Sequence, residues 1–136
     1  MEATKGQVIP AHALPAITRE HLRNYAEASG DPNPIHLDDA AAKKAGLPGV
    51  IAHGMLIAGF VSERGVRFMQ DELGGQYEVK QVQLRFRAMT FVGDVISVAG
   101  SVRKVSGSEV TLELQASKQT GEVVATGTLR FARRLA

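Results

Sequence analysis

The spacing of apolar residues along the chain changes once, at Gly74-Gly75. Before this point apolar positions recur every three or four residues, which is the spacing of amphipathic helices. After it, apolar and polar residues alternate, which is the spacing of strands that bury one face. The pattern therefore predicts an α+β fold, with helices in the first half and antiparallel strands in the second.

Two helices are expected in the first 46 residues of the chain. The first covers residues 18–29, with Thr18 as its N-cap. Residues 30–34 (GDPNP) end it, because two prolines and a glycine in five residues cannot continue a helix. A second, short helix opens at Asp38-Asp39, where acidic residues suit a helix start, and stops at Gly46.

A third helix is predicted from near Gly54 to about Leu73, and its first two turns are apolar on nearly all sides. We expect such a helix to be buried. Turn signals at residues 93–94, 106–108 and 120–121 separate four alternating segments, which predict an antiparallel meander with one apolar face. The predicted strands are 82–87, 96–103, 110–117 and 123–131. A curved sheet packed around the central helix, in one domain over residues 1–136, accommodates both patterns.

Composition narrows the class of protein. The chain has 136 residues, 44% of them hydrophobic and 22% charged, which is typical of one soluble domain. It contains no cysteine, which excludes disulfides, thiol catalysis and cysteine-based metal sites. The net charge is only +2 and the cations are not clustered with aromatic residues, so we expect no nucleic-acid partner. We see no export signal or membrane span, and we expect a cytoplasmic protein.

Candidate chemistry is concentrated in the loop after the first predicted helix. Asp31 and His36 lie five residues apart in a segment that two prolines stiffen. A carboxylate and an imidazole that converge on one point form a general acid–base pair. A nucleophilic triad is a second possibility, but the chain has no Gly-x-Ser-x-Gly elbow. A metal site needs a third ligand, for which Asp38, Asp39 and His53 are nominal candidates. In the purely structural alternative, Asp31 caps a turn and His36 is a buried, hydrogen-bonded side chain.

The second candidate is Gly54, at the opening of the predicted buried helix. A backbone N–H at a helix N-terminus stabilises an oxygen that gains negative charge, and the missing side chain lets that oxygen approach. The structural alternative is a glycine that is needed only for a tight start of the helix. His53, beside it, is more often a structural histidine than a catalytic one.

Two motifs give this region a specific resemblance. Residues 25–36 (YAEASGDPNPIH), with Ala42 six residues later, resemble the signature of the (R)-specific enoyl-CoA hydratases and MaoC-like dehydratases. Residues 51–56 (IAHGML) resemble the second motif of the same family, and the match continues in order through the predicted strands. The resemblance implies the hot-dog fold, in which a sheet wraps around a long helix.

The implied activity is reversible addition of water to a trans-2-enoyl thioester in fatty-acid metabolism, which gives a (3R)-hydroxyacyl thioester. By resemblance, Asp31 and His36 hold and activate the water, and the Gly54 N–H polarises the thioester carbonyl. The resemblance leaves open which side chain is the acid and which is the base. The implied supporting residues are Asn33, which orients the loop, Ser62, which hydrogen-bonds to Asp31, and His53.

The family resemblance also implies partners. No metal or redox cofactor is required, and coenzyme A or an acyl-carrier protein carries the substrate. The family typically forms dimers, so we expect a homodimer. Two alternatives are a non-catalytic acyl-thioester-binding subunit and a hot-dog thioesterase. The presence of both Asp31 and His36 argues against the first. The second commonly uses a carboxylate on the long helix, where Glu63 is the only one among the first ten residues.

Overall fold

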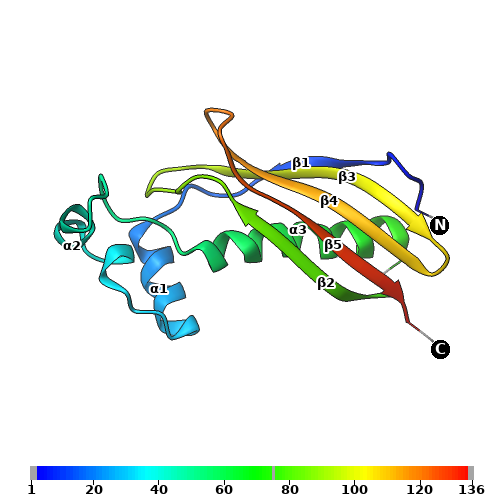
Figure 1. Ribbon diagram of the computed structural model, residues 1–136, viewed down its shortest axis with the longest axis horizontal. Helices are drawn as coiled ribbons and strands as arrows, with labels where there is room; N and C mark the ends of the chain where they lie inside the picture. Colours follow the sequence, from blue (N-terminus) through cyan, green and yellow to red (C-terminus); the bar gives the residue numbers. More distant parts are fainter. Residues whose placement is uncertain (1–2, 75, 135–136) are drawn as a thin grey trace.

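The computed structural model describes residues 3–74 and 76–134. Its elements in chain order are β1 (Val8–Ala13), α1 (Arg19–Ser29), the 3₁₀ turn η1 (Pro34–His36), α2 (Asp39–Lys44), α3 (Gly54–Leu73), β2 (Tyr77–Phe86), β3 (Ile96–Ser106), β4 (Glu109–Lys118) and β5 (Val123–Arg133). The strands form one antiparallel sheet in the order β1-β3-β4-β5-β2, which curves along α3 (Figure 1). This arrangement is the hot-dog fold.

The predicted helices are confirmed, and their ends have clear local causes. Thr18 and His21 cap α1 reciprocally, since each side chain accepts a hydrogen bond from the other residue's backbone N–H. Gly30 ends this helix with a left-handed φ of 75°, which favours glycine. Helix α3 begins at Gly54 and ends at Leu73. Helix α2 ends at Lys44, two residues before the predicted stop. None of the helices in the described ranges is long and apolar enough to cross a bilayer.

The expectation of four strands is wrong, because a fifth strand, β1, lies near the beginning of the chain. It pairs with β3, and the register shifts between Ile9 and His12. Ile9 is the only buried residue of β1, and Pro10 interrupts its pattern. An edge strand of this kind buries too little on either face to show an alternating pattern.

The predicted meander is confirmed only for β3, β4 and β5. Strand β2 pairs with β5 at the far edge of the sheet and not with β3, its successor in the chain. The connection from β2 to β3 crosses the end of the sheet and pairs with the segment before α3, through a bridge between Ile51 and Phe91. This bridge therefore holds the segment just before α3 against the connection between β2 and β3.

Helix α3 is buried on one side, which corrects the expectation that its first two turns are covered all round. Ile57, Val61 and Phe68 pack into the core against the sheet. Met55 is 66% exposed, and the sheet lies along one side of the helix (Figure 1). At Gly65 the helix packs tightly against the sheet, since a Cβ atom there would lie 3.0 Å from the Leu129 side chain.

This close approach predicts opposite effects for one substitution at two glycines of α3. Gly65→Leu should lower the free energy of unfolding by about 1–3 kcal/mol, because the added atoms overpack the helix–sheet contact. Gly59→Leu is the matched control, since a Cβ at Gly59 meets nothing within 4 Å. It should leave stability unchanged or raise it by up to about 1 kcal/mol through helix propensity. Urea unfolding measures both changes, and equal stability of the two variants would contradict the packing described here.

Candidate active site

The loop between α1 and α2 meets the beginning of α3 at one end of the sheet, away from the start of β1 and the end of β5 (Figure 1). Asn33 organises this loop. Its side-chain oxygen accepts from the N–H of Ile35 at 3.2 Å, and its carbonyl accepts from the N–H of His36 at 3.0 Å. The Asp31 carboxylate accepts from the N–H of Asn33 at 3.3 Å. These bonds fix the two candidate catalytic residues relative to each other.

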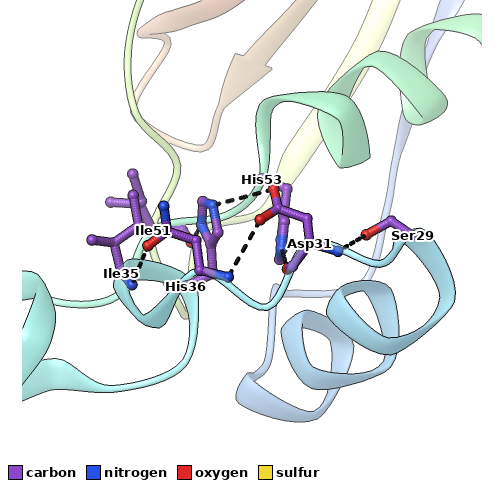
Figure 2. A network of polar contacts seen from close by, with 7 residues as sticks. Ser29, Asp31, Ile35, His36, Ile51 and His53 are labelled. Carbon is purple, nitrogen blue, oxygen red and sulfur yellow. Dashed lines mark hydrogen bonds and ion pairs between the residues drawn. The ribbon is translucent and has the colours of Figure 1, made fainter.

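A hydrogen bond from its imidazole ring holds the His36 side chain in place. Its Nδ1 lies 2.7 Å from the carbonyl oxygen of Ile51. A carbonyl can only accept, so Nδ1 carries the hydrogen, and in the neutral ring Nε2 has a free lone pair. This Nε2 lies 4.0 Å from Oδ2 of Asp31 (Figure 2). The separation is too long for a direct hydrogen bond, and it matches the spacing at which one water oxygen, about 2.8 Å from each atom, can bridge two groups.

The His36 side chain is 10% exposed, and that of Asp31 is 54% exposed. A molecule from solvent can therefore reach the pair from the Asp31 side, while the imidazole is enclosed by protein. The geometry satisfies the requirement for an acid–base pair that acts on one small molecule. It also contains both features of the structural alternative, since Asp31 closes a turn and His36 is buried and hydrogen-bonded.

His53 lies directly against this pair. Its ring stacks on His36, with centroids 3.8 Å apart and an angle of 23° between the planes. Its Nε2 donates to the carbonyl oxygen of Asp31 at 3.1 Å. On its other side, the Tyr25 ring makes an edge contact with a centroid distance of 4.8 Å. His53 is only a supporting candidate from the sequence, because no pattern in the chain indicates that it contacts both Asp31 and His36.

Charged and backbone groups anchor the segment that leads to Gly54. Asp39 accepts a hydrogen bond from the N–H of Val50 at 3.2 Å and pairs with Arg19 at 2.6 Å. The Arg19 hydrogen bond, together with the Val50 N–H, lowers the pKa of Asp39 below its usual value. Two residues after Val50, the N–H of Ala52 donates to the carbonyl of Thr90 at 2.8 Å. The beginning of α3 is therefore tied to α1, to α2 and to the connection after β2.

Gly54 is the first residue of α3, and its backbone N–H has no partner within the helix. His53, at the N-cap position, makes no side-chain cap bond. The ring of Phe86, on β2, lies over Gly54, and a Cβ atom at Gly54 would lie 3.3 Å from its Cζ. The sequence does not place Phe86 in this region, because its alternating position marks it only as an inward-facing residue of a strand.

The structure also tests the metal candidates. Asp31, His36 and His53 each place a ligand atom within 4.8 Å of the others. A histidine binds a metal along a lone pair in its ring plane, and the two stacked rings have nearly parallel planes. Their lone pairs therefore do not converge on one ion. Asp38 caps α2 through the N–H of Ala40, and Asp39 pairs with Arg19, so neither completes a ligand set.

Two predicted residues of α3 do not join the pair. Ser62 lies about 12 Å beyond Gly54 along the helix axis, and within the described residues it makes no hydrogen bond to Asp31. Glu63 pairs with Arg67 on the exposed side of α3 at 3.4 Å. It lies about 13 Å beyond Gly54 at 1.5 Å per residue, which is too far to act on a carbonyl held at the Gly54 amide.

An apolar cleft of about 410 Å³ adjoins the site at Tyr25. It lies between α1, the segment before it and the first two turns of α3. Its lining residues are Leu14, Pro15, Ile17, His21, Asn24, Tyr25, Leu56 and Phe60. The cleft exposes mainly hydrocarbon surface, which suits an aliphatic group. Tyr25 lines the cleft and also contacts the His53 ring, so this one side chain separates the cleft from His53.

Comparison with known proteins identifies the family to which this fold and candidate site belong. The family model described as MaoC like domain matches residues 2–125. The chain therefore belongs to the MaoC-like dehydratase family.

Individual relatives are similar over different lengths. The (R)-hydratase from A. caviae involved in PHA biosynthesis has the same fold, with a TM-score of 0.84, 25% identity and 98% of each chain covered. A UPF0336 protein of Streptomyces avermitilis is 30% identical over 88% of this chain and 85% of its own. The mitochondrial 3-hydroxyacyl-[acyl-carrier-protein] dehydratase of Arabidopsis thaliana is 39% identical over 57% of this chain, which spans only 43% of that protein.

Proposed function

We propose that this protein hydrates trans-2-enoyl thioesters reversibly to (3R)-hydroxyacyl thioesters. The observation that carries the proposal is the 4.0 Å separation of Asp31 Oδ2 and His36 Nε2, with Nδ1 of His36 committed to the Ile51 carbonyl. This arrangement leaves one lone pair and one carboxylate facing a space that fits a water molecule. Similarity to an (R)-hydratase and to a 3-hydroxyacyl dehydratase supports the same reaction.

In the proposed reaction, a water molecule lies between the two side chains. Nε2 of His36 accepts one of its protons while the water oxygen forms a bond to C3 of the substrate. The Asp31 carboxylate accepts a hydrogen bond from the second proton and so orients the attacking lone pair. His36 then returns its proton to C2 from the same side. Hydroxyl and hydrogen therefore add to one face of the double bond, and dehydration follows the reverse path.

Negative charge develops on the thioester oxygen as water adds to C3. We assign its stabilisation to the Gly54 N–H at the beginning of α3, where helix dipole and hydrogen bond act together. The Phe86 ring packs directly over Gly54, so any side chain at this position would press against that ring. The thiol portion of the substrate is coenzyme A or an acyl-carrier protein, and the apolar cleft beside Tyr25 suits part of its acyl group.

A direct assay distinguishes this function from a thioesterase or a binding subunit. Purified protein is mixed with trans-2-enoyl-CoA substrates of four to sixteen carbons. Loss of enoyl absorbance without release of free thiol, and formation of the (3R) product on a chiral column, are expected. Release of thiol at the same rate would indicate hydrolysis instead. Binding without turnover at every chain length would indicate a non-catalytic subunit.

The water-sharing geometry predicts strongly non-additive effects of two substitutions. Asp31→Asn and His36→Gln should each lower kcat by about 10² to 10⁴, because each removes one of two groups that act on a single water. The double variant should be little slower than the worse single variant. Steady-state kinetics on enoyl-CoA measure this, with circular dichroism as the control for folding. A folded single variant that kept more than a tenth of the wild-type rate would refute the assignment.

The proposed role of Gly54 predicts a change in turnover and not in binding. Gly54→Pro removes the donor, and proline is tolerated in the first turn of a helix. His53, which would precede that proline, already has φ −62° and ψ 136°, a conformation that proline permits. We expect folded protein with kcat lowered by about 10² to 10³. A raised KM at unchanged kcat would show that Gly54 only makes room for the substrate.

We also propose that the protein is a homodimer in which a second chain covers β2. This edge strand carries apolar side chains on the face toward α3 that a single chain leaves uncovered, since Val82 is 44% and Phe86 is 49% exposed. Both pair with buried residues of β5, namely Leu129 and Ala125, so they belong to the inner face of the sheet. Exposed strand edges with apolar side chains are normally paired or covered.

Two valines at opposite edges of the sheet test this assembly. Sedimentation velocity at micromolar concentration should give twice the mass of one chain. Val82→Lys, on β2, should shift the protein toward monomer, because it places a charge in the covered face. Val8→Lys, on the β1 edge, is the matched control and should stay dimeric, since Val8 is 69% exposed and lies at the other edge. A fully active wild-type monomer would contradict the proposal.

A further inference from the structure

His53 combines three features that no requirement of the fold explains. It is only 2% exposed, it lies face to face with His36, and it donates to the backbone carbonyl of Asp31. One side chain therefore contacts both members of the candidate pair (Figure 2). Tyr25 on α1 packs against it by an edge contact and completes a stack of three rings that ends at His36.

The hydrogen-bond partners of His53 define its chemical form. Nε2 faces the Asp31 carbonyl, which can only accept, so this nitrogen carries the hydrogen. Nδ1 is therefore a bare lone pair, and it is buried without a hydrogen-bond partner in the described part of the chain. The hydrogen bond to Asp31 therefore assigns the hydrogen of the neutral ring to Nε2.

A buried polar atom without a partner destabilises the folded state, and replacement by an apolar group of the same shape removes that cost. A phenylalanine at position 53 would fill the same space and keep the stacking contacts. The hydrogen bond of His53 to the Asp31 carbonyl and its stack on His36 both involve the candidate pair, and these two contacts set His53 apart from other buried polar residues.

We propose that His53 is a positioning residue that holds Asp31 and His36 at their working separation; this inference rests on the proposed hydration. The face of the His53 ring fixes the plane of His36, so that Nε2 of His36 is directed at the Asp31 carboxylate. The Nε2–H of His53 holds the Asp31 backbone in place. The position of this backbone determines where the Asp31 carboxylate lies, 4.0 Å from Nε2 of His36. When His36 holds the proton of the water, the ring of His53 lies face to face with the charged imidazole.

Three substitutions separate these contacts. His53→Phe keeps the ring and loses the donor, His53→Gln keeps a donor and loses the ring, and His53→Ala loses both. Misplacement of a catalytic group by about 1 Å costs up to about 10²-fold in rate. We therefore expect kcat to fall about tenfold in the Phe and Gln variants and about a hundredfold in the Ala variant. KM should change less than twofold, because His53 is buried behind the reacting groups.

Thr90→Val is the matched control. The Thr90 hydroxyl is also buried without a partner, and its backbone carbonyl holds Ala52, next to His53. Valine keeps that backbone contact, so kcat should equal that of the wild type. If His53 were only structural, each variant would lower the melting temperature and leave kcat per folded molecule unchanged. We expect the opposite for His53→Phe, with a melting temperature at or above that of the wild type and a reduced kcat.

Nitrogen-15 NMR of the histidine side chains gives a readout that does not depend on activity. In the wild type, His36 should show the tautomer with hydrogen on Nδ1. In His53→Ala this tautomer should be partly lost, and in His53→Phe it should be retained. A wild type without hydratase activity would refute the proposed function, while the NMR result would still decide whether His53 positions His36. Wild-type kcat and an unchanged His36 tautomer in folded His53→Ala would overturn the inference.

Discussion

The hydrogen bond from Nδ1 of His36 to the Ile51 carbonyl is the interaction on which the site depends. At 2.7 Å it joins the turn after α1 to the segment before α3, two parts of the chain that are 15 residues apart. It fixes where the hydrogen of the imidazole lies, and so leaves Nε2 free to face Asp31. Because one partner is a backbone carbonyl, the bond persists only while the Ile51 segment keeps its position. The remainder of the fold can be understood as the support of that segment.

That support comes from three directions. Asp39 holds Val50 from α2, and the connection after β2 holds Ile51 and Ala52 through Phe91 and Thr90. This connection lies in place because β2 crosses to the far edge of the sheet before the chain returns to β3. The unusual strand order therefore serves the site directly. A simple meander would have turned back at the end of β2 and left the beginning of α3 without this backbone partner.

The sequence predicted what depends on local pattern. The ends of α1 and α3 follow from Thr18, Gly30 and Gly74, whose conformational preferences act on their immediate neighbours. The acid–base candidates were found because Asp31 and His36 share one short loop. What the sequence could not predict depends on contacts between distant segments. Strand β1 has a single buried residue, and the pairing of β2 with β5 leaves no trace in the alternation of either strand.

The same limit applies within the site. The stack of His53 on His36 and the cover that Phe86 provides over Gly54 both join elements separated by many residues. An alternating strand position marks Phe86 only as inward-facing, and a histidine before a helix has several ordinary roles. Met55 shows the converse error, since an apolar residue near the beginning of this helix is expected in the core but is 66% exposed. The sequence of a helix does not show which of its apolar residues will face a sheet that distant residues form.

The position of Phe86 links two processes that otherwise have separate locations. Its ring borders the Gly54 amide, while its backbone belongs to β2, the unpaired edge of the sheet. A substrate at the amide and a second chain on β2, both as proposed above, would therefore contact the same aromatic side chain. Any preference of one for a particular ring orientation is passed to the other, and thermodynamic linkage makes this effect reciprocal. In the proposed dimer, substrate binding and subunit association are therefore coupled through the orientation of the Phe86 ring.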